Sequence, residues 1–465
     1  MSARRRLLTL LVSLAAIVTA RGAAAEGTET EGVRVMSLDE ALAYAREHQP
    51  QMRASLARVA AEKEAAEIPR AQWLPSAGVT AQIFGATANN TTGTYVGTRD
   101  VDIPRIGGTR SLSSGSWQPY GSTLVAAGLN QQVFDFGRIA AQSAAADAAV
   151  DVERQRSKGA LLEVTFDVQE AYFAVLAAKA VVKASEDAYE RSRAHRDYAK
   201  AGVDSGMRSP IEGTRAEADL TRFDIGRIRA RGGLANARAV LAATIGTAEA
   251  EIDAGEAPKS PPDAPALERA IQEASRRDPR MLEALARLHA EEQRSRAIGA
   301  ELRPDLSLTA TLSGRAGGAP PSGNGEPANG SGFVPNVANW DVGLIFSWPL
   351  FDGVISARRD ASRAREEVRR QEIAVVRTQQ IGAIRQAYVG VDVAHTALPG
   401  LQRAVDAARA NYAQAEARFK SGLGTSVELA DAEAIRTDAE IQVALGQFQL
   451  ARARSELGRS ISEGL

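Results

Sequence analysis

The feature that most constrains the fold of this chain is a tandem repeat, because the second half restates the pattern of the first. Pro50-Gln51-Met52 is matched by Pro279-Arg280-Met281, an offset of 229 residues (279 minus 50). Ser205-Gly206 is matched by Ser421-Gly422, an offset of 216 residues (421 minus 205). Self-similarity of this kind indicates duplicated structural units. Whatever elements the first half forms, the second half is therefore predicted to form again.

Most of each half has the pattern of long helices. Only 5% of the 465 residues are aromatic and 24% are charged, a composition that suits long helices better than a wide globular core. Long helices are predicted from Gly137 to about Lys200 and from Gly353 to about Lys420. After a glycine-containing turn, each is followed by a helix about half as long, at Ser209 to Ile245 and Thr425 to Ile461. Each pair is thus predicted to form a helical hairpin, with tips at 202–211 and 421–426.

A further half-length helical region opens each repeat. In the first, Ser37 and Glu40 have the spacing of a capping box, and Pro50 interrupts the helical pattern before it runs on to about Trp73. At about 1.5 Å per residue, two half-length helices together match the length of one long helix, roughly 95 to 100 Å. The half-length helices are therefore predicted to stack end to end beside the long helix of their repeat.

Between these helical regions the periodicity changes to alternation of apolar and polar residues. Two strand pairs are predicted, within 76–134 and 305–350, each joined by a polar, glycine-rich loop. Each strand has about 10 residues, the length of a tilted strand that crosses a membrane, although alternation alone also fits a soluble sandwich. Trp340 and Trp348 stand at opposite ends of one apolar face and are predicted to be membrane-interface anchors.

The N-terminus predicts export. Arg4-Arg5-Arg6, a short apolar run and Ala23-Ala24-Ala25 are typical of a signal peptide covering residues 1–25. The remaining chain is predicted to contain a first repeat at 26–245, a linker at 246–265 and a second repeat at 266–465. No later stretch is apolar enough for a transmembrane helix, so any crossing of a bilayer is predicted to use the strands.

Composition also excludes several functions. The net charge of −1 gives no support for nucleic-acid binding, and the absence of cysteine excludes thiolate metal sites and cysteine nucleophiles. No catalytic or phosphate-binding motif is present, so no enzyme activity, cofactor or metal is predicted. The four histidines are dispersed along the chain and are predicted to be solvated residues on helix faces. They are His48, His195, His289 and His395.

One chain is not enough to complete either predicted layer. Four strands cannot close a membrane barrel, since small barrels need about eight. Long helices with small, alanine-rich faces need lateral neighbours. Three associated chains would supply about 12 strands and about 12 helical columns. The alternative is a secreted structural coiled-coil protein with a small β-cap, which leaves the repeated strand pairs unexplained.

The repeat, the proline-flanked strands and the glycine-containing tips resemble the TolC family of outer-membrane efflux and secretion channels, over about Ser37 to Ile461. The resemblance implies long helices that form a periplasmic α-barrel, and four strands per chain in a trimeric 12-stranded outer-membrane β-barrel. It implies a homotrimer embedded in outer-membrane lipid. It also implies a periplasmic adaptor and an inner-membrane transporter of RND, ABC or MFS type, in an efflux pump or type I secretion system. Without cysteine, the chain resembles the unlipidated branch.

The resemblance also assigns roles at the hairpin tips. It implies a periplasmic constriction formed by residues of both tips: Glu428, Asp431, Glu212, Phe419 and Arg208. Adaptor contacts are implied for the turn residues: Gly206, Met207, Gly422 and Leu423. One departure is that the family's gating arginine is replaced here by Gly424, while Arg208 holds the analogous place in the first tip. The acids also have a simpler explanation, since carboxylates at helix starts complement the helix dipole.

Overall fold

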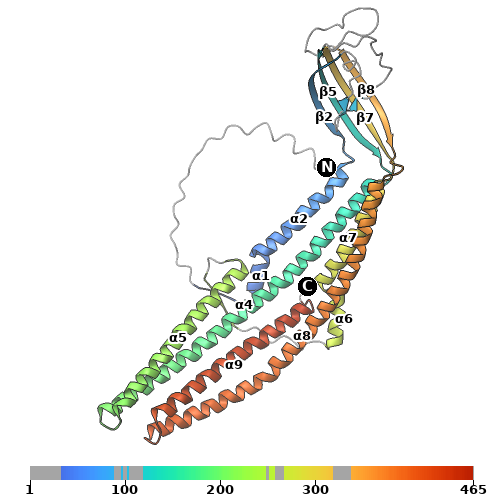
Figure 1. Ribbon diagram of the computed structural model, residues 1–465. Helices are drawn as coiled ribbons and strands as arrows, with labels where there is room; N and C mark the ends of the chain where they lie inside the picture. Colours follow the sequence, from blue (N-terminus) through green and yellow to red (C-terminus); the bar gives the residue numbers. More distant parts are fainter. Residues whose placement is uncertain are drawn as a thin grey trace, which may run out of the picture.

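The computed structural model describes residues 33–87, 96–97, 102–103, 119–247, 251–256, 266–317 and 337–463. The molecule is elongated, with a β-sheet at one end and two helical hairpin tips at the other (Figure 1). The predicted signal peptide and most of the two polar loops between the strands lie outside the described residues.

The sheet at the upper end contains four long strands, two from each half of the chain. They are β2 (Ser76–Thr87), β5 (Pro119–Phe134), β7 (Asp305–Gly317) and β8 (Val337–Ser347). Their order is β2-β5-β7-β8, and every neighbouring pair is antiparallel. The strand pairs predicted from the alternation are therefore confirmed, and the two pairs join through β5 and β7. Two shorter strands, β3 (Val96–Gly97) and β4 (Asp102–Ile103), pair with each other.

Long and half-length helices fill the rest of the molecule in the predicted order. The first half contains α1 (Leu38–His48), α2 (Pro50–Ala71), α4 (Arg138–Asp204) and α5 (Pro210–Ile245). The second half contains α6 (Leu267–Arg277), α7 (Pro279–Ala300), α8 (Gly353–Lys420) and α9 (Ser426–Ser460). The predicted helix limits agree with these bounds to within a few residues.

Local chemistry at the helix ends explains where these helices begin. The predicted capping box is present: the Ser37 amide donates to Glu40 Oε2 at 2.8 Å, and the Ser37 hydroxyl accepts from the Glu40 amide at 3.3 Å. At the base of the sheet, the Asp352 side chain accepts from the Val354 and Ile355 amides and starts α8. Such caps satisfy amides that the first turn of a helix cannot pair internally.

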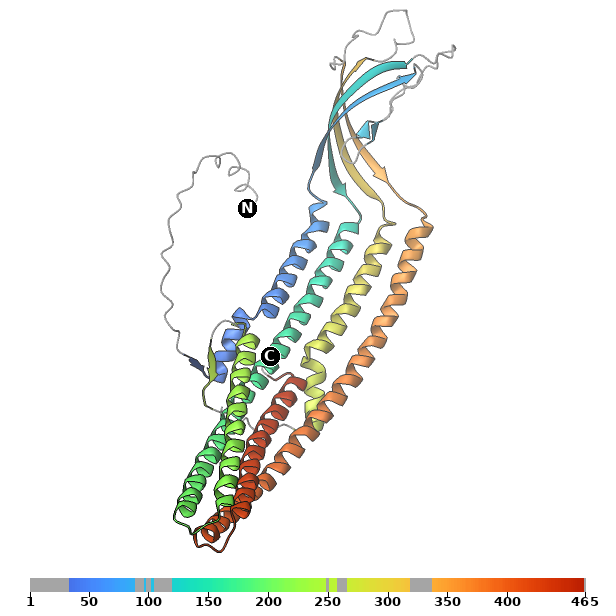
Figure 2. The ribbon, with the colours of Figure 1, turned by 60° about the vertical axis from the view of Figure 1, so that its left-hand side comes forward.

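Helices of half length lie end to end beside the two long ones, as predicted. Near the sheet, α2, α4, α7 and α8 lie side by side, whereas toward the tips the neighbours of α4 and α8 are α5 and α9 (Figure 2). Helix α5 ends at Gly246, whose φ of 89° is left-handed. A Cβ at Gly246 would lie 2.9 Å from Gln49 Cα, so α5 ends directly against the junction between α1 and α2. Only glycine fits this close approach.

A small parallel sheet, which the sequence analysis did not predict, lies beside the middle of α4. Strand β1 (Arg34–Met36) pairs with β6 (Ile252–Ala254), which lies inside the predicted linker. The fully buried Tyr172 on α4 holds both strands, because its hydroxyl donates to the Met36 carbonyl at 3.2 Å and the Glu256 carbonyl at 3.0 Å.

Charge also fixes β6 to the first hairpin. Asp253 on β6 lies 2.8 Å from Lys179 Nζ on α4 and accepts from Arg238 Nη2 on α5 at 2.9 Å. Burial opposes ionisation of Asp253, but hydrogen bonds from Arg238 and Lys179 outweigh it and hold its pKa below the usual value. Residues 252–254, inside the predicted linker, therefore pack against the first hairpin as a strand.

Candidate functional site

The two hairpin tips have the same backbone turn. Gly206 and Gly422 take left-handed φ values of 72° and 76° directly after the C-caps of α4 and α8. In the first tip the Met207 amide donates to the Gly202 carbonyl at 2.9 Å. The Leu423 amide makes the equivalent bond to Arg418 at 2.9 Å in the second. A left-handed glycine after a helix is the usual way to satisfy its last carbonyls. The duplicated sequence therefore builds a duplicated turn.

The starts of the returning helices differ in chemistry. In the second tip the Thr425 hydroxyl accepts from the Glu428 amide at 3.2 Å and caps α9. In the first tip Ser209 makes no side-chain cap, and α5 begins with Pro210. Glu212 and Glu428 occupy the first turns of their helices, where a carboxylate is favoured by the helix dipole.

Arg208 crosses from the first hairpin to the second. Its Nη1 donates to Glu212 Oε2 at 2.6 Å, and its Nη2 donates to the Phe419 carbonyl at 2.6 Å. Its Cζ also lies 3.8 Å from the centre of the Phe419 ring. This approach needs Gly202, since a Cβ there would lie 2.7 Å from Arg208 Cδ. The guanidinium thus joins an acid of its own tip to the backbone and ring of the other tip.

The second tip has no equivalent arginine. Gly424 stands at the position that corresponds to Arg208, and a Cβ there would lie 3.1 Å from Arg418 Cβ. Glu428 instead lies 3.8 Å from Arg418 Nε, in an exposed pair within one hairpin. Exposed pairs of this kind contribute little. The contact between the tips therefore depends on the arginine of the first tip.

Phe419 is the centre of an aromatic contact between the two hairpins. Its side chain is only 2% exposed and packs with Leu429 and Ala432 of the same hairpin and Ala199 of the other. The ring of Tyr198 lies 5.7 Å from that of Phe419, and its hydroxyl donates to the Lys420 carbonyl at 3.1 Å. In this conformation the ring of Phe419 fills the contact between the hairpins.

His195 belongs to the same contact, and its predicted place on a solvated helix face is wrong. The ring is 9% exposed and meets Phe419 edge-to-face at 4.6 Å between centroids. Its Nε2 is buried and has no hydrogen-bond partner among the described residues. Burial is the largest influence on the pKa of His195 and lowers it, as does Arg208, while Asp219 and Glu212 act in the opposite direction. The net effect is a lowered pKa.

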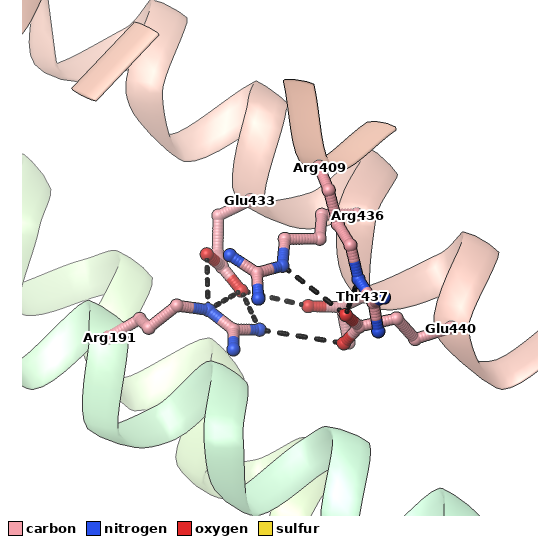
Figure 3. Close-up of polar contacts among 6 residues, drawn as sticks. All are labelled: Arg191, Arg409, Glu433, Arg436, Thr437 and Glu440. Atoms are coloured by element: carbon pink, nitrogen blue, oxygen red, sulfur yellow. Dashed lines mark hydrogen bonds and ion pairs between the residues drawn. The ribbon is translucent and has the colours of Figure 1, made fainter. Parts of the chain in front are cut away.

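A second, polar contact joins the hairpins further from the tips (Figure 3). Arg191 on α4 donates from Nε to both carboxylate oxygens of Glu433, at 3.0 and 2.9 Å, and from Nη2 at 2.7 Å. Glu433 is buried and also accepts from Thr437 at 3.0 Å. Glu440 lies 3.8 Å from Arg191 Nη2 and accepts from Arg409 Nε at 3.0 Å. One arginine of α4 is therefore held between two glutamates of α9.

Tyr412 on α8 covers this polar cluster. Its ring centre lies 5.9 Å from Arg191 Cζ and 5.0 Å from Arg436 Cζ. Burial, more than the nearby Glu433 and Glu416, raises the pKa of Tyr412 to about 12. Desolvation of this kind disfavours the phenolate form. The two hairpins therefore meet through an aromatic contact at the tips and a charged contact behind it.

The structure brings together only some of the residues predicted at the constriction. Arg208, Glu212 and Phe419 are in contact, whereas Glu428 and Asp431 are exposed on the surface of α9. The turn residues Met207 and Leu423 are 81% and 77% exposed. Trp340 and Trp348 are also exposed, on the β8 edge of the molecule.

Sequence reasoning missed Arg191 and Glu433, although a signal was available. Arg191 corresponds to Ala407 in the second half, at the offset of 216 residues (407 minus 191). Asn411 likewise replaces His195 at this offset (411 minus 195). Positions where a repeat substitutes a charged or titratable residue for a neutral one indicate a local task that the other half does not share.

None of the described helices is both long enough and apolar enough to cross a membrane. The described residues contain no group of three or more acids and histidines placed to hold a metal ion.

Comparison with known proteins defines the class. A family model described as outer membrane efflux protein matches residues 41–247 and 270–462 of this chain. The chain therefore belongs to the outer membrane efflux protein family. It is a channel protein of the outer membrane, whose helical part extends into the periplasm. The predicted family resemblance and fold class are confirmed.

Solved structures share the fold at low sequence identity. The Campylobacter jejuni CmeC outer membrane channel is 15% identical with a TM-score of 0.70, over 92% of this chain and 86% of that chain. The Neisseria gonorrhoeae MtrE outer membrane channel, in its open state, is 18% identical with a TM-score of 0.66, over 92% and 89%. The outer-membrane channel OprN is 21% identical with a TM-score of 0.66, over 92% and 90%. A search of curated proteins finds no match.

Proposed function

We propose that three copies of this chain form the outer-membrane duct of a tripartite efflux pump or type I secretion system. The observation that carries this proposal is the open sheet. Strands β2 and β8 are its two edges and each pairs on one side only within the described chain. Open strand edges do not occur in lipid, because their amide and carbonyl groups would be unsatisfied. Pairing β8 of one copy with β2 of the next satisfies both edges and closes about 12 strands after three copies.

The helical layer supports the same assembly. Helices α2 and α8 flank the row of helices near the sheet, and both carry exposed apolar residues (Figure 2). On α2 these include Leu56 and Ile68, and on α8 they include Val368 and Val375. Burial of apolar surface stabilises association by roughly 25 cal/mol per Å². Contact between α8 of one copy and α2 of the next would cover these residues and extend the ring into the periplasm.

The duct is passive and receives its substrate from other proteins. An inner-membrane transporter of RND, ABC or MFS type supplies the energy, and a periplasmic adaptor joins it to the duct. The adaptor binds the tips through Gly206, Met207, Gly422 and Leu423. The high exposure of Met207 and Leu423 supports this assignment, since flexible apolar side chains at a tip suit a protein contact. Trp340 and Trp348 anchor the sheet in outer-membrane lipid.

The tips also form the gate of the duct. In this proposal the exposed Glu428 and Asp431 face a common axis, where three copies place about six carboxylates and favour cations. Phe419 and the Arg208–Glu212 pair hold the second hairpin against the first, so they set the width of the entrance. Arg208 of the first tip takes the role of the gating arginine, whose family position in the second tip is occupied by Gly424.

Membrane extraction, oligomeric state, ion conduction and ion selectivity test this function. The protein should require detergent for extraction, migrate as a trimer after crosslinking, and conduct ions in planar bilayers. Recovery as a soluble protein without detergent would support the alternative of a secreted coiled-coil protein.

Replacing Glu428 and Asp431 with alanine should reduce the preference for cations, whereas alanine at Asp360, an exposed acid near the sheet, serves as the matched control. Unchanged selectivity in the double variant would remove both acids from the constriction.

A further inference from the structure

His195 is the one buried histidine on the described part of α4, and it lies where the two hairpins touch near their tips. Its ring packs edge-to-face on Phe419 of α8, and its Nε2 has no hydrogen-bond partner among the described residues. A buried nitrogen without a partner accepts a proton only by acquiring a charge that nothing in the contact solvates. The neutral ring therefore fits this contact, and the protonated ring does not.

Charged groups around the ring come from the tip and from α5. Arg208 contacts the same phenylalanine as His195, with its Cζ 3.8 Å from the Phe419 ring centre. Asp219 and Glu212 of α5 also act on the ring, and both favour its protonated form. Glu212, however, already accepts from Arg208 at 2.6 Å. From α8 the group in contact is the uncharged Phe419, and from α9 the same cluster contains Leu429 and Ala432.

A proton on His195 would thus place two cations on one aromatic ring. Arg208 already lies over Phe419, so an imidazolium beside the same ring meets a like charge and loses hydration. Moving the second hairpin away restores water to both groups. We propose that His195 makes the contact between the hairpins sensitive to pH, so that protonation releases the second tip and widens the entrance. This inference rests on the proposed channel function.

The direction of the effect follows from linkage. A histidine with a lowered pKa in the closed contact is neutral there, while the ordinary pKa of about 6.5 applies once the contact opens. Closure is therefore fully stable above about pH 6.5 and weakens as the pH falls below it. Between pH 7.5 and 5.5, the equilibrium between open and closed contact shifts by up to about tenfold per chain.

Conductance in planar bilayers tests the proposal. The wild-type channel should show a severalfold rise in conductance or open probability from pH 7.5 to 5.5. His195→Gln, which cannot become charged, should lose the rise, whatever its conductance at pH 7.5. His395→Gln, at an exposed position on α8, is the matched control and should keep it. A rise that persists in His195→Gln overturns the proposal.

A chemical readout separates this inference from the channel function. The chain has no cysteine, so a single thiol can be placed at Ala199, which is fully buried one turn beyond His195 in the same contact. The rate at which N-ethylmaleimide modifies this thiol is divided by the rate for a thiol at the exposed position 421, in the variant Ser421→Cys. The ratio cancels the pH dependence that both thiols share.

The ratio should rise severalfold at pH 5.5 and stay constant when His195 is replaced by glutamine or phenylalanine. A constant ratio in the chain that retains His195 overturns the inference, whatever the conductance shows. Absence of current at every pH would instead count against the proposed channel function, while the ratio still tests the contact.

Discussion

The two long helices show how a duplicated chain assigns different tasks to equivalent elements. Helices α4 and α8 have 67 and 68 residues and end in the same turn. Yet α4 packs between α2, α5, α7 and α9, whereas α8 lies at the edge of the molecule against α6, α7 and α9. Tyr172 of α4 is fully buried, while its repeat partner Tyr388 is only half-buried. Duplication has kept the length of the helix, and its neighbours decide which residues it buries.

The largest expected effect comes from breaking the core of α4. Tyr172→Ala removes a fully buried ring and the two hydrogen bonds that hold β1 and the end of β6. Loss of a buried aromatic side chain costs about 3 to 5 kcal/mol. Tyr388→Ala, at the equivalent position of α8, should cost about 1 kcal/mol because the side chain is half-buried.

Denaturant unfolding of the purified protein, followed by circular dichroism, measures both variants. Equal losses for Tyr172→Ala and Tyr388→Ala would contradict the distinction between a central and an edge helix. Tyr172→Phe separates the ring from its hydroxyl and should cost about 1 kcal/mol, the usual value for lost hydrogen bonds.

A smaller effect is expected at the charged contact between the halves. Arg191→Met leaves the buried Glu433 without its main partner and should cost about 2 to 3 kcal/mol, the loss from a broken buried pair reduced because Arg191 is partly exposed. Replacing Glu433 as well, with leucine, should restore part of the loss. Ala407→Arg places an arginine at the equivalent exposed position of α8 and should change stability by less than about 0.5 kcal/mol.

The double-mutant cycle of Arg191 and Glu433 is the deciding measurement. Additive losses would mean that the two side chains do not stabilise each other, despite their three hydrogen bonds.

The smallest effect appears only at high pH and sharpens the view of α8. Tyr412 of α8 is buried beside Arg191 of α4, and its pKa is raised to about 12. The neutral phenol therefore contributes stability that is fully present below about pH 10 and is lost as the pH rises toward 12. At pH 11 the loss should be about 1 kcal/mol. Comparison with Tyr412→Phe isolates the effect, since the two proteins differ only in this hydroxyl.

Much of the fold could be predicted because its signals are local and occur twice. The capping box at Ser37, the prolines that end the first helical segments and the glycines of the tips each specify backbone geometry within a few residues. The alternation in the strands specifies an exposed and a covered face. The prolines, the tip glycines and the alternation occur in both halves of the chain, so each of these predictions had a second occurrence to support it. A chain without a repeat gives no such second occurrence.

What could not be predicted depends on partners distant in the chain. The strand β6 has only three residues, within the predicted linker. Its position depends on Arg238 and Lys179, which bind the Asp253 carboxylate, and on Tyr172, which donates to the Glu256 carbonyl just beyond the strand. Only the approach of the second hairpin buries His195 against Phe419 and pairs Arg191 with Glu433, and these contacts cannot be read from the sequence of α4 itself. The roles predicted for Glu428 and Asp431 stay predictions, because a single chain leaves both on an open surface.

The parallel pairing of β1 with β6 also sets an order of events in biogenesis. Residues 34 and 252 are partners separated by 218 positions (252 minus 34). A chain that is exported from its N-terminus therefore delivers β1 long before β6 arrives, and contacts of such separation form slowly. Until then the first strand has no partner within the small sheet, and the Tyr172 hydroxyl lacks its second acceptor, the Glu256 carbonyl. We therefore expect the small sheet to form only after residues 252–254 have been exported, later than the local contacts of the first hairpin.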